Sequence, residues 1–283
     1  MQYQYGIVAF FDILGFGSLI KNNEKTLGEV ATLLSILKTK SNTENVLPTR
    51  SDVDGIAFSD SFVRVVMQGD APDLQILAMS EFCHLENMQR LIIREFGLLV
   101  RGAITIGEFF IEDNIVFGPA LVRAVGLEKH CAKRIPDTNG MPVILLDHNI
   151  DILTKITNKK DVPQTLKEAS QFTREGNPVS ILNYCKIMSL GLGVGNFDDG
   201  KKRTINFLTK QRNVILTAIE RFTGNLNVLD KYKWLACYHN REIHKLKSCL
   251  HFQPEYNELC EQLVTEDDIP GVNDIEFYFQ TWN

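Results

Sequence analysis

The chain has 283 residues, of which 44% are hydrophobic, so it can bury the core of one large domain or of one domain with an appendage. Its 30 basic and 35 acidic residues give a formal net charge of −5, which argues against broad coating of nucleic acid or of an anionic membrane surface. The six cysteines form no C-x-x-C pair, and neither a secretory leader nor a membrane-spanning run is found, so we expect a cytoplasmic protein with reduced thiols.

Hydrophobic periodicity predicts strands alternating with helices in the first half of the chain. An apolar run favours a central strand at residues 3–12, and apolar residues at helical spacing indicate a helix over residues 26–37. The elements predicted after these are two strands hinged at 59–61, a helix over 73–96, a strand over 98–110, a short strand with a helix over 115–132, and a strand over 141–147. This β-α-β-β-α-β order with an extension predicts an α+β fold with a ferredoxin-like split unit.

The second half of the chain has a different character and is expected to be mainly helical. Residues 161–250 show helical patterning, which is strongest in an amphipathic pair at about 200–223 and 227–250. We therefore divide the chain into an α+β domain at residues 1–155 and a helical C-terminal extension at residues 156–283. The extension could pack on the domain, enlarge a dimer interface or hold a partner, and its sequence leaves these alternatives open.

Asp12 and Asp60 are acidic residues within apolar segments. The first strand and the hairpin of a β-α-β-β unit are usually neighbours, so both carboxylates are expected to face the same point. Two such groups repel each other unless a divalent cation lies between them, and oxygen ligands suit Mg²⁺ or Mn²⁺. The alternative is a helix cap at Asp12 and a turn residue at Asp60. The occurrence of both acids favours the metal site.

Two glycines follow Asp12 in the segment Gly15-Phe16-Gly17. Glycine permits backbone conformations that direct N–H groups toward a ligand, and a helix is expected to start nearby. We therefore predict that this segment binds phosphate oxygens.

Four segments resemble, in the same order, the class III nucleotidyl cyclases. AFFDILGFGSLI is similar to their metal-binding segment F-x-D-I-x-G-F, and AFSDSFVRVV is similar to their hairpin. VRGAITIGEFF resembles the strand R-I-G-I-x-x-G, and IVFGPALVRAVGLEK resembles W-G-x-x-V-N-x-A-x-R-L-E. The resemblance covers roughly residues 3–150 and implies a cyclase catalytic domain. It further implies two Mg²⁺ or Mn²⁺ ions held by Asp12, Asp60 and the backbone carbonyl of Ile13.

Several positions depart from the purine cyclases. The lysine and aspartate that read a purine base correspond to Ile56 and Ile115, and the asparagine and arginine that support the transition state correspond to Val122 and Gly126. An apolar pair cannot hydrogen-bond a purine in the usual way. With the tail pattern K..WL..Y.N at 231–240, these features resemble the bacterial pyrimidine cyclases of the Pycsar antiphage system. That resemblance implies conversion of UTP or CTP to a cyclic nucleotide, head-to-tail homodimers with composite active sites, and a separate effector protein that senses the product.

Three arginines are candidates for a cation facing the α-phosphate, namely Arg101, Arg123 and Arg134. Arg101 could instead pair across the sheet, while a solvated helix face would equally explain the other two. Glu128 is expected to have a structural role. Arg50, in the polar loop before the hairpin, would donate to O4 of uracil and therefore favours UTP over CTP. A nucleotide-sensing dimer without activity and a purine cyclase remain alternatives.

Overall fold

The computed structural model describes residues 2–21, 25–41, 53–69, 73–113, 115–131, 142–147, 150, 171–174, 177–181, 197–248 and 254–270. The chain divides into two compact units. The first unit comprises Met1–Ile92, Leu98–Cys131 and Pro142–Leu182, and the second comprises Ile93–Gly97, Ala132–Met141 and Asn183–Asn283. The domain boundary predicted after residue 155 lies outside the described residues.

The first unit contains a mixed sheet with helices on its faces. Its strands are β1 (Gln4–Leu14), β2 (Val53–Phe58), β3 (Ser61–Met67), β4 (Leu99–Glu112), β5 (Ile115–Phe117), β6 (Ile144–Leu146), β7 (Gln171–Arg174) and β8 (Asn177–Ile181). Its helices are α1 (Phe16–Lys21), α2 (Leu27–Ser41), α3 (Leu74–Phe96, whose last turn belongs to the second unit) and α4 (Pro119–Cys131). The strands and helices predicted between residues 3 and 147 are confirmed to within a few residues.

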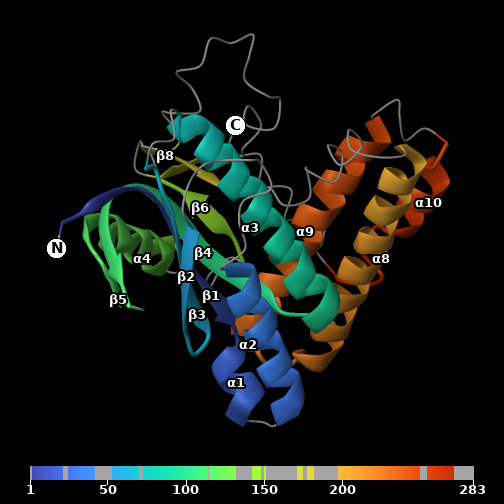
Figure 1. The fold of residues 1–283 in the computed structure, drawn as a ribbon. Helices are drawn as coiled ribbons and strands as arrows, with labels where there is room; N and C mark the ends of the chain where they lie inside the picture. Colours follow the sequence, from blue (N-terminus) through green and yellow to red (C-terminus); the bar gives the residue numbers. More distant parts are fainter. Residues whose placement is uncertain are drawn as a thin grey trace. The chain divides into compact units, whose positions relative to one another are not determined.

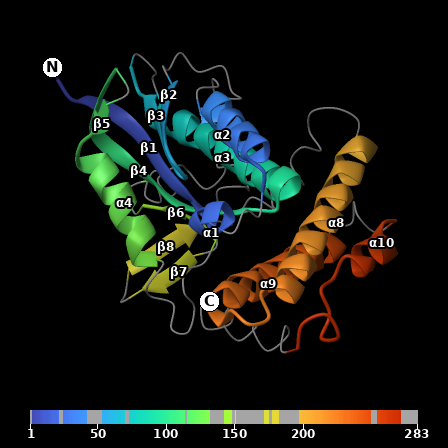
Figure 2. The same cartoon turned by 90° about the horizontal axis from the view of Figure 1, so that it is seen from below.

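The strand order confirms the predicted α+β, ferredoxin-like arrangement. The sheet runs β2-β3-β1-β4-β6-β8-β7, and β5 pairs with β4. Its first four strands are antiparallel and follow the order expected of a β-α-β-β-α-β unit. Helix α4 covers one face of this sheet, while α2 and α3 cover the other (Figures 1 and 2). The predicted central position of the first strand is confirmed, because β1 lies between β3 and β4.

The stretch 171–181 differs from the helical interpretation of residues 161–250. There β7 and β8 form an antiparallel pair, and β8 continues the sheet beside β6. These segments have four and five residues, which is too short for a period of 2 to be distinguished from one of 3.6.

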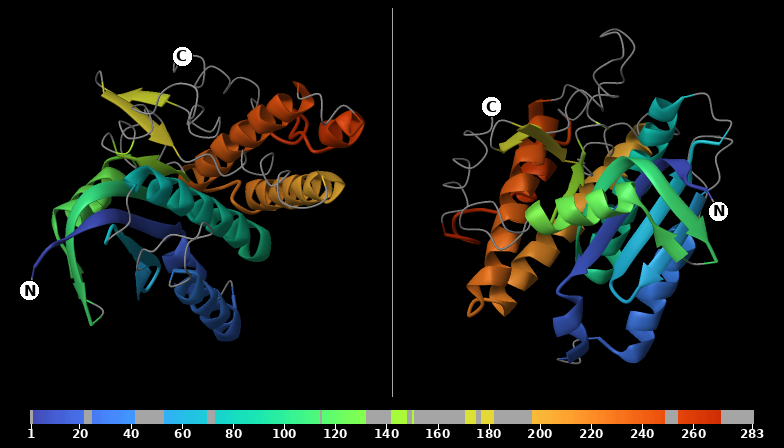
Figure 3. Two further views of the ribbon diagram at one scale, coloured as in Figure 1. Left: turned by 45° about the horizontal axis from the view of Figure 1, so that its top comes forward. Right: turned by 90° about the vertical axis from the view of Figure 1, so that its left-hand side faces the viewer.

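The centre of the sheet is tightly packed because β1 is buried along most of its length. Its neighbour β4 approaches so closely at Gly102 that an added Cβ would lie 2.3 Å from the carbonyl oxygen of Phe10. On the face covered by α3, the guanidinium of Arg64 donates from Nε to both carboxylate oxygens of Glu81 at 2.9 Å, and neither side chain is exposed. This pair joins β3 to α3 in the interior of the first unit, whose layers are visible in Figure 3.

The second unit is helical in its described part. It contains α8 (Phe197–Arg221), α9 (Leu226–Ser248) and α10 (Tyr256–Glu261), and the amphipathic pair predicted from the sequence corresponds to α8 and α9. Ile205, Leu208, Ile243 and Leu259 form a core cluster among these helices. None of the described helices is both long and apolar enough to cross a bilayer.

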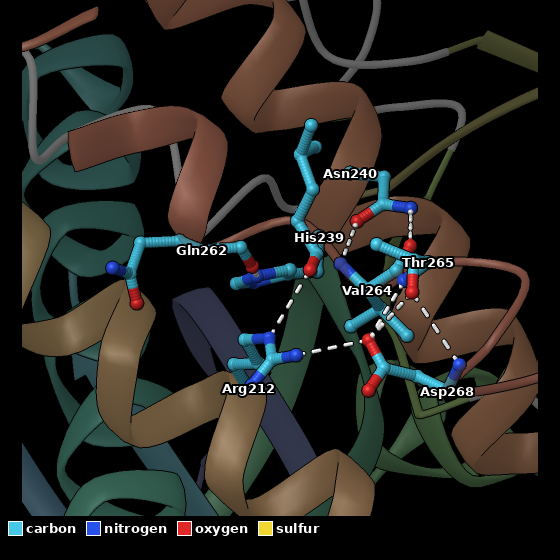
Figure 4. Close-up of polar contacts among 8 residues, drawn as sticks. Arg212, His239, Asn240, Gln262, Val264, Thr265 and Asp268 are labelled. Carbon is cyan, nitrogen blue, oxygen red and sulfur yellow. Dashed lines mark hydrogen bonds and ion pairs between the residues drawn. The ribbon is translucent and has the colours of Figure 1, made fainter. Parts of the chain in front are cut away.

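Hydrogen bonds and an ion pair connect residues 262–268 to α8 and α9 (Figure 4). The buried imidazole of His239 lies 2.9 Å from Gln211 Oε1 and 2.8 Å from the carbonyl oxygen of Gln262. Asn240 donates to the carbonyl oxygen of Val264 and accepts from its N–H. Burial lowers the pKa of His239 to about 4, so its imidazole is neutral at physiological pH and serves as a structural contact.

Candidate functional site

Asp12 lies near the end of β1, where both neighbouring strands place polar residues beside it. Its register partners are Ser61 of β3 and Arg101 of β4. Residues directly opposite each other in an antiparallel sheet project to the same face, so these three side chains are neighbours. The hydroxyl of Ser61 donates to Asp12 Oδ1 at 3.0 Å. This contact of Ser61 was not predicted from the sequence, although the serine directly follows Asp60 in the FSDS motif.

Asp60 lies in the tight turn between β2 and β3, next to the end of β1. The preceding residue of this turn, Ser59, has a φ of 57°. The backbone N–H of Ile13 donates to the carbonyl oxygen of Asp60 at 3.0 Å, which fixes the turn against β1. The backbone at Asp60 therefore lies beside the end of β1 that carries Asp12. That the two carboxylates share a metal ion stays a prediction.

The local environment raises the pKa of the Asp12 carboxyl to about 6. Burial is the largest cause, and the charge of Asp60 acts in the same direction. The hydrogen bond from Ser61 and the charge of Arg101 oppose this rise in pKa. No ion pair among the described residues includes Asp12. Within the described part of the chain its carboxylate therefore has no ion-pair partner, which makes it a good candidate ligand for a cation.

The donors at this point fit a hard divalent cation. Two carboxylates and the backbone carbonyl of Ile13 between them offer oxygen atoms only. Within the described ranges, no cluster of three or more histidine, cysteine or acidic residues could hold a metal ion. The protein would therefore leave coordination positions to water or phosphate oxygens, as Mg²⁺ sites with few carboxylates do.

The predicted phosphate-binding segment adjoins the end of β1. Gly15 has a φ of 79°, which a residue with a Cβ rarely adopts, and α1 begins at Phe16. Among the described residues, apart from the adjoining backbone, no heavy atom lies within 4 Å of an added Cβ at either Gly15 or Gly17. The Phe16 side chain is buried and contributes to the core. Phosphate binding by this backbone remains a prediction.

The two described candidate arginines are held by acidic residues. Arg101 forms an ion pair with the buried carboxylate of Glu128 on α4, rather than across the sheet. The largely exposed Arg123 lies with Nη1 3.4 Å from Oδ2 of Asp147, which directly follows β6. Arg134 lies outside the described residues, as does Arg50. The structural role expected of Glu128 agrees with its burial and its ion pair.

Ile56 and Ile115, the residues predicted to line a base pocket, are widely separated in one chain. Ile56 is buried on β2 and, through the strand register, aligns with Ala103 of β4. Ile115 lies opposite Glu112, several residues further along β4, and is 60% exposed. Their register positions on β4 are therefore nine residues apart, at Ala103 and Glu112. That the two residues line one base pocket stays a prediction.

No protein-family model matches the chain, and no curated protein does. Among solved structures, it is similar to the adenylyl cyclase CyaB from P. aeruginosa, with 18% identity, a TM-score of 0.41, and coverage of 64% of this chain and 93% of that one. It is also similar to the dimeric guanylyl cyclase domain of the RhoGC fusion protein from the aquatic fungus Blastocladiella emersonii. There the identity is 14%, the TM-score 0.37, and the coverage 63% of this chain and 95% of that one. Neither likeness assigns a substrate or a site residue to this chain.

Proposed function

We propose that this protein is a nucleotidyl cyclase that converts UTP to 3′,5′-cyclic UMP and pyrophosphate. In this reaction the ribose 3′-oxygen forms a bond to the α-phosphorus, and the bond from that phosphorus to the pyrophosphate oxygen breaks. The observation that carries the proposal is the proximity of Asp12 and Asp60 at the end of the central strand, beside an open glycine segment. The motif resemblance supports the same reaction.

In this proposal the acidic residues position the reacting groups. Two bound Mg²⁺ or Mn²⁺ ions would supply positive charge that activates the 3′-hydroxyl and offsets the charge of the triphosphate. Asp12 and Asp60 would hold these ions, and the Ile13 carbonyl would serve as a further ligand. The backbone N–H groups of the segment 15–17 orient the phosphates. Because phosphoryl transfer depends chiefly on positioning and electrostatic stabilisation, these roles account for most of the catalysis.

The pyrimidine preference rests on the apolar residues at the two base-reading positions. Ile56 and Ile115 offer no hydrogen bond to a purine edge, and a buried polar edge left unpaired costs roughly 1–3 kcal/mol. Arg50 would donate to O4 of uracil, whereas cytosine presents an amino group there. We therefore favour UTP over CTP, and CTP over the purine nucleotides.

Incubating the protein with equal concentrations of the four nucleoside triphosphates and Mn²⁺ tests this preference by mass spectrometry of the products. Mainly cyclic UMP is expected. Mainly cyclic CMP would overturn the assignment of Arg50, and mainly cyclic AMP or GMP would overturn the pyrimidine specificity.

A homodimer completes the proposed site. The resemblance implies a composite site, and Ile115 is 60% exposed, so a second chain would cover the part of the pocket that Ile115 lines. An exposed apolar patch near Ile115 supports this arrangement. Its residues are Tyr3, Ile115 and Phe117. The rings of Tyr3 and Phe117 meet edge to face at 6.2 Å, where the start of β1 approaches β5 (Figures 1 and 3). A second copy of the chain would bury this patch.

Mixing inactive variants tests whether the active sites are composite. An Asp12→Ala protein combined with an Arg101→Ala, Arg123→Ala or Arg134→Ala protein should regain activity if that arginine acts across the interface. Analytical ultracentrifugation of each single variant controls for loss of the dimer. If none of the three mixtures regains activity although the variants still form dimers, the cation that faces the phosphate belongs to the same chain as the carboxylates.

A nucleotide-sensing dimer without catalysis is the second candidate. It is favoured by Val122 and Gly126, which occupy the positions of the two transition-state residues in the family. Val122 is 73% exposed, and the space beside Gly126 is open. Calorimetric binding of UTP with no cyclic product, in the presence of Mn²⁺, would support this candidate over the enzyme.

The sequence resemblance extends the proposal to antiphage defence. Cyclic UMP would act there as a signal for a separate effector protein. Expression in a bacterial host, with cyclic UMP measured during phage infection, tests this role. A rise in cyclic UMP that depends on Asp12 is expected, and an unchanged level would contradict it.

A further inference from the structure

The orientation of the Asp12 carboxylate depends on the groups that flank it on β3 and β4. Ser61 occupies the register position beside it on β3, and its hydroxyl donates to Oδ1 at 3.0 Å. Both side chains are partly buried, so this bond is less exposed to competition from water than one on the open surface.

Arg101, which lies beside Asp12 on β4, forms its ion pair with a residue of α4. The Arg101 guanidinium forms its ion pair with Glu128, which is buried on α4. Among the hydrogen bonds described for this part of the chain, the one from Ser61 is the bond that holds the Asp12 side chain. The serine hydroxyl therefore sets the rotation of this carboxylate.

We propose that Ser61 is a positioning residue that holds the Asp12 carboxylate ready to bind a divalent cation. An ionised carboxylate has two acceptor oxygens, and the Ser61 bond occupies one direction at Oδ1 while Oδ2 stays available as a ligand. Partners that orient a ligating side chain in this way typically contribute about 10–100-fold to metal affinity. This inference rests on the proposed cyclase function and assigns a residue to its metal site.

Another hydroxyl of the same sheet provides a matched control. Thr105 of β4 donates from Oγ1 to the carbonyl oxygen of Ala120 at 2.9 Å and is fully buried. It aligns with Val8, several residues along β1 from Asp12. Thr105→Val removes a hydroxyl bond of similar length without touching the carboxylates, so it measures the purely structural consequence of such a loss.

The test compares Mn²⁺ binding by the wild type, Ser61→Ala, Ser61→Thr and Thr105→Val proteins. Free Mn²⁺ is counted by electron paramagnetic resonance without nucleotide, and urea unfolding is followed in parallel. Ser61→Ala should weaken Mn²⁺ binding by about 10-fold or more. Ser61→Thr keeps the hydroxyl and should restore most of the affinity, whereas Thr105→Val should bind Mn²⁺ as the wild type does.

The outcomes separate this inference from the proposed function. Unchanged Mn²⁺ affinity in Ser61→Ala, with binding lost in Asp12→Ala, would overturn the role of Ser61 alone. Equal losses in Ser61→Ala and Thr105→Val would also overturn it, because the effect would then be structural. If Asp12→Ala binds Mn²⁺ as tightly as the wild type does, the metal site is wrongly assigned, and the proposed function is overturned with it.

Discussion

The acidic residues that lie on the two faces of the sheet differ in whether an arginine is bonded to them. On the face covered by α3, the Glu81 carboxylate is fully buried and bonded by Arg64 through both oxygens. On the face covered by α4, the buried Glu128 is likewise paired with Arg101, whereas Asp12 accepts a hydrogen bond from Ser61 and has no ion pair among the described residues. Burial raises the pKa of both Asp12 and Glu81. A buried acid whose charge is balanced by arginine is a structural feature, whereas a partly exposed acid beside another acid is suited to bind a cation.

Replacing either acid of the proposed metal site should give the largest effect. Asp12→Ala and Asp60→Ala should each lower the rate of cyclic nucleotide formation by more than about 100-fold, because a lost ligand removes the bound cation. Product measured by mass spectrometry with Mn²⁺ checks this expectation, and circular dichroism controls for folding. Substantial Mn²⁺-dependent activity in either variant would show that the site is wrongly assigned.

The balanced pair on the opposite face should matter for stability. Glu81→Gln leaves the buried Arg64 charge without its counter-charge and should lower the free energy of unfolding by about 3–5 kcal/mol, measured in urea. The double variant Arg64→Met/Glu81→Leu replaces the pair with apolar groups and should recover most of that loss. A cost below about 1 kcal/mol for Glu81→Gln would contradict the structural role of this pair.

The sequence predicted the positions of the two acidic residues but not the side-chain contacts around them. Strand and helix periodicity, together with the β-α-β-β order, predicted that Asp12 and Asp60 meet. The ion pairs were not predicted, because the pairing of Arg101 with Glu128 or of Arg64 with Glu81 depends on how helices lie over strands. Ser61 was interpreted only as a turn residue, since its contact with Asp12 follows from a register that local sequence does not encode.

The raised pKa of Asp12 predicts an effect of pH on the stability of the protein. Asp12 has a pKa of about 6 in the folded protein, whereas in the unfolded chain its pKa is near the ordinary value of 3.8. Stability from this group is therefore fully present below pH 3.8 and is lost as the pH rises toward 6. Asp12→Asn lacks this titration, so its stability relative to the wild type should increase between pH 4 and pH 7 without metal. A constant difference in urea unfolding across this range would contradict the raised pKa.

The smallest effect is expected for Arg123. Its side chain is 51% exposed, so its ion pair with Asp147 should contribute at most about 1 kcal/mol to folding. Urea unfolding of Arg123→Gln measures that contribution. A loss comparable to that of Glu81→Gln would mean that this pair is as important structurally as the one on the other face.

Cyclase chemistry at Asp12 and Asp60 is tested most directly by following UTP with Mn²⁺ and the purified wild-type protein. We expect cyclic UMP and pyrophosphate to appear in equal amounts, and the matched Asp12→Asn protein to form neither. Absence of cyclic product from each nucleoside triphosphate tested singly with the wild type, or equal product from the wild type and Asp12→Asn, would contradict the proposed function.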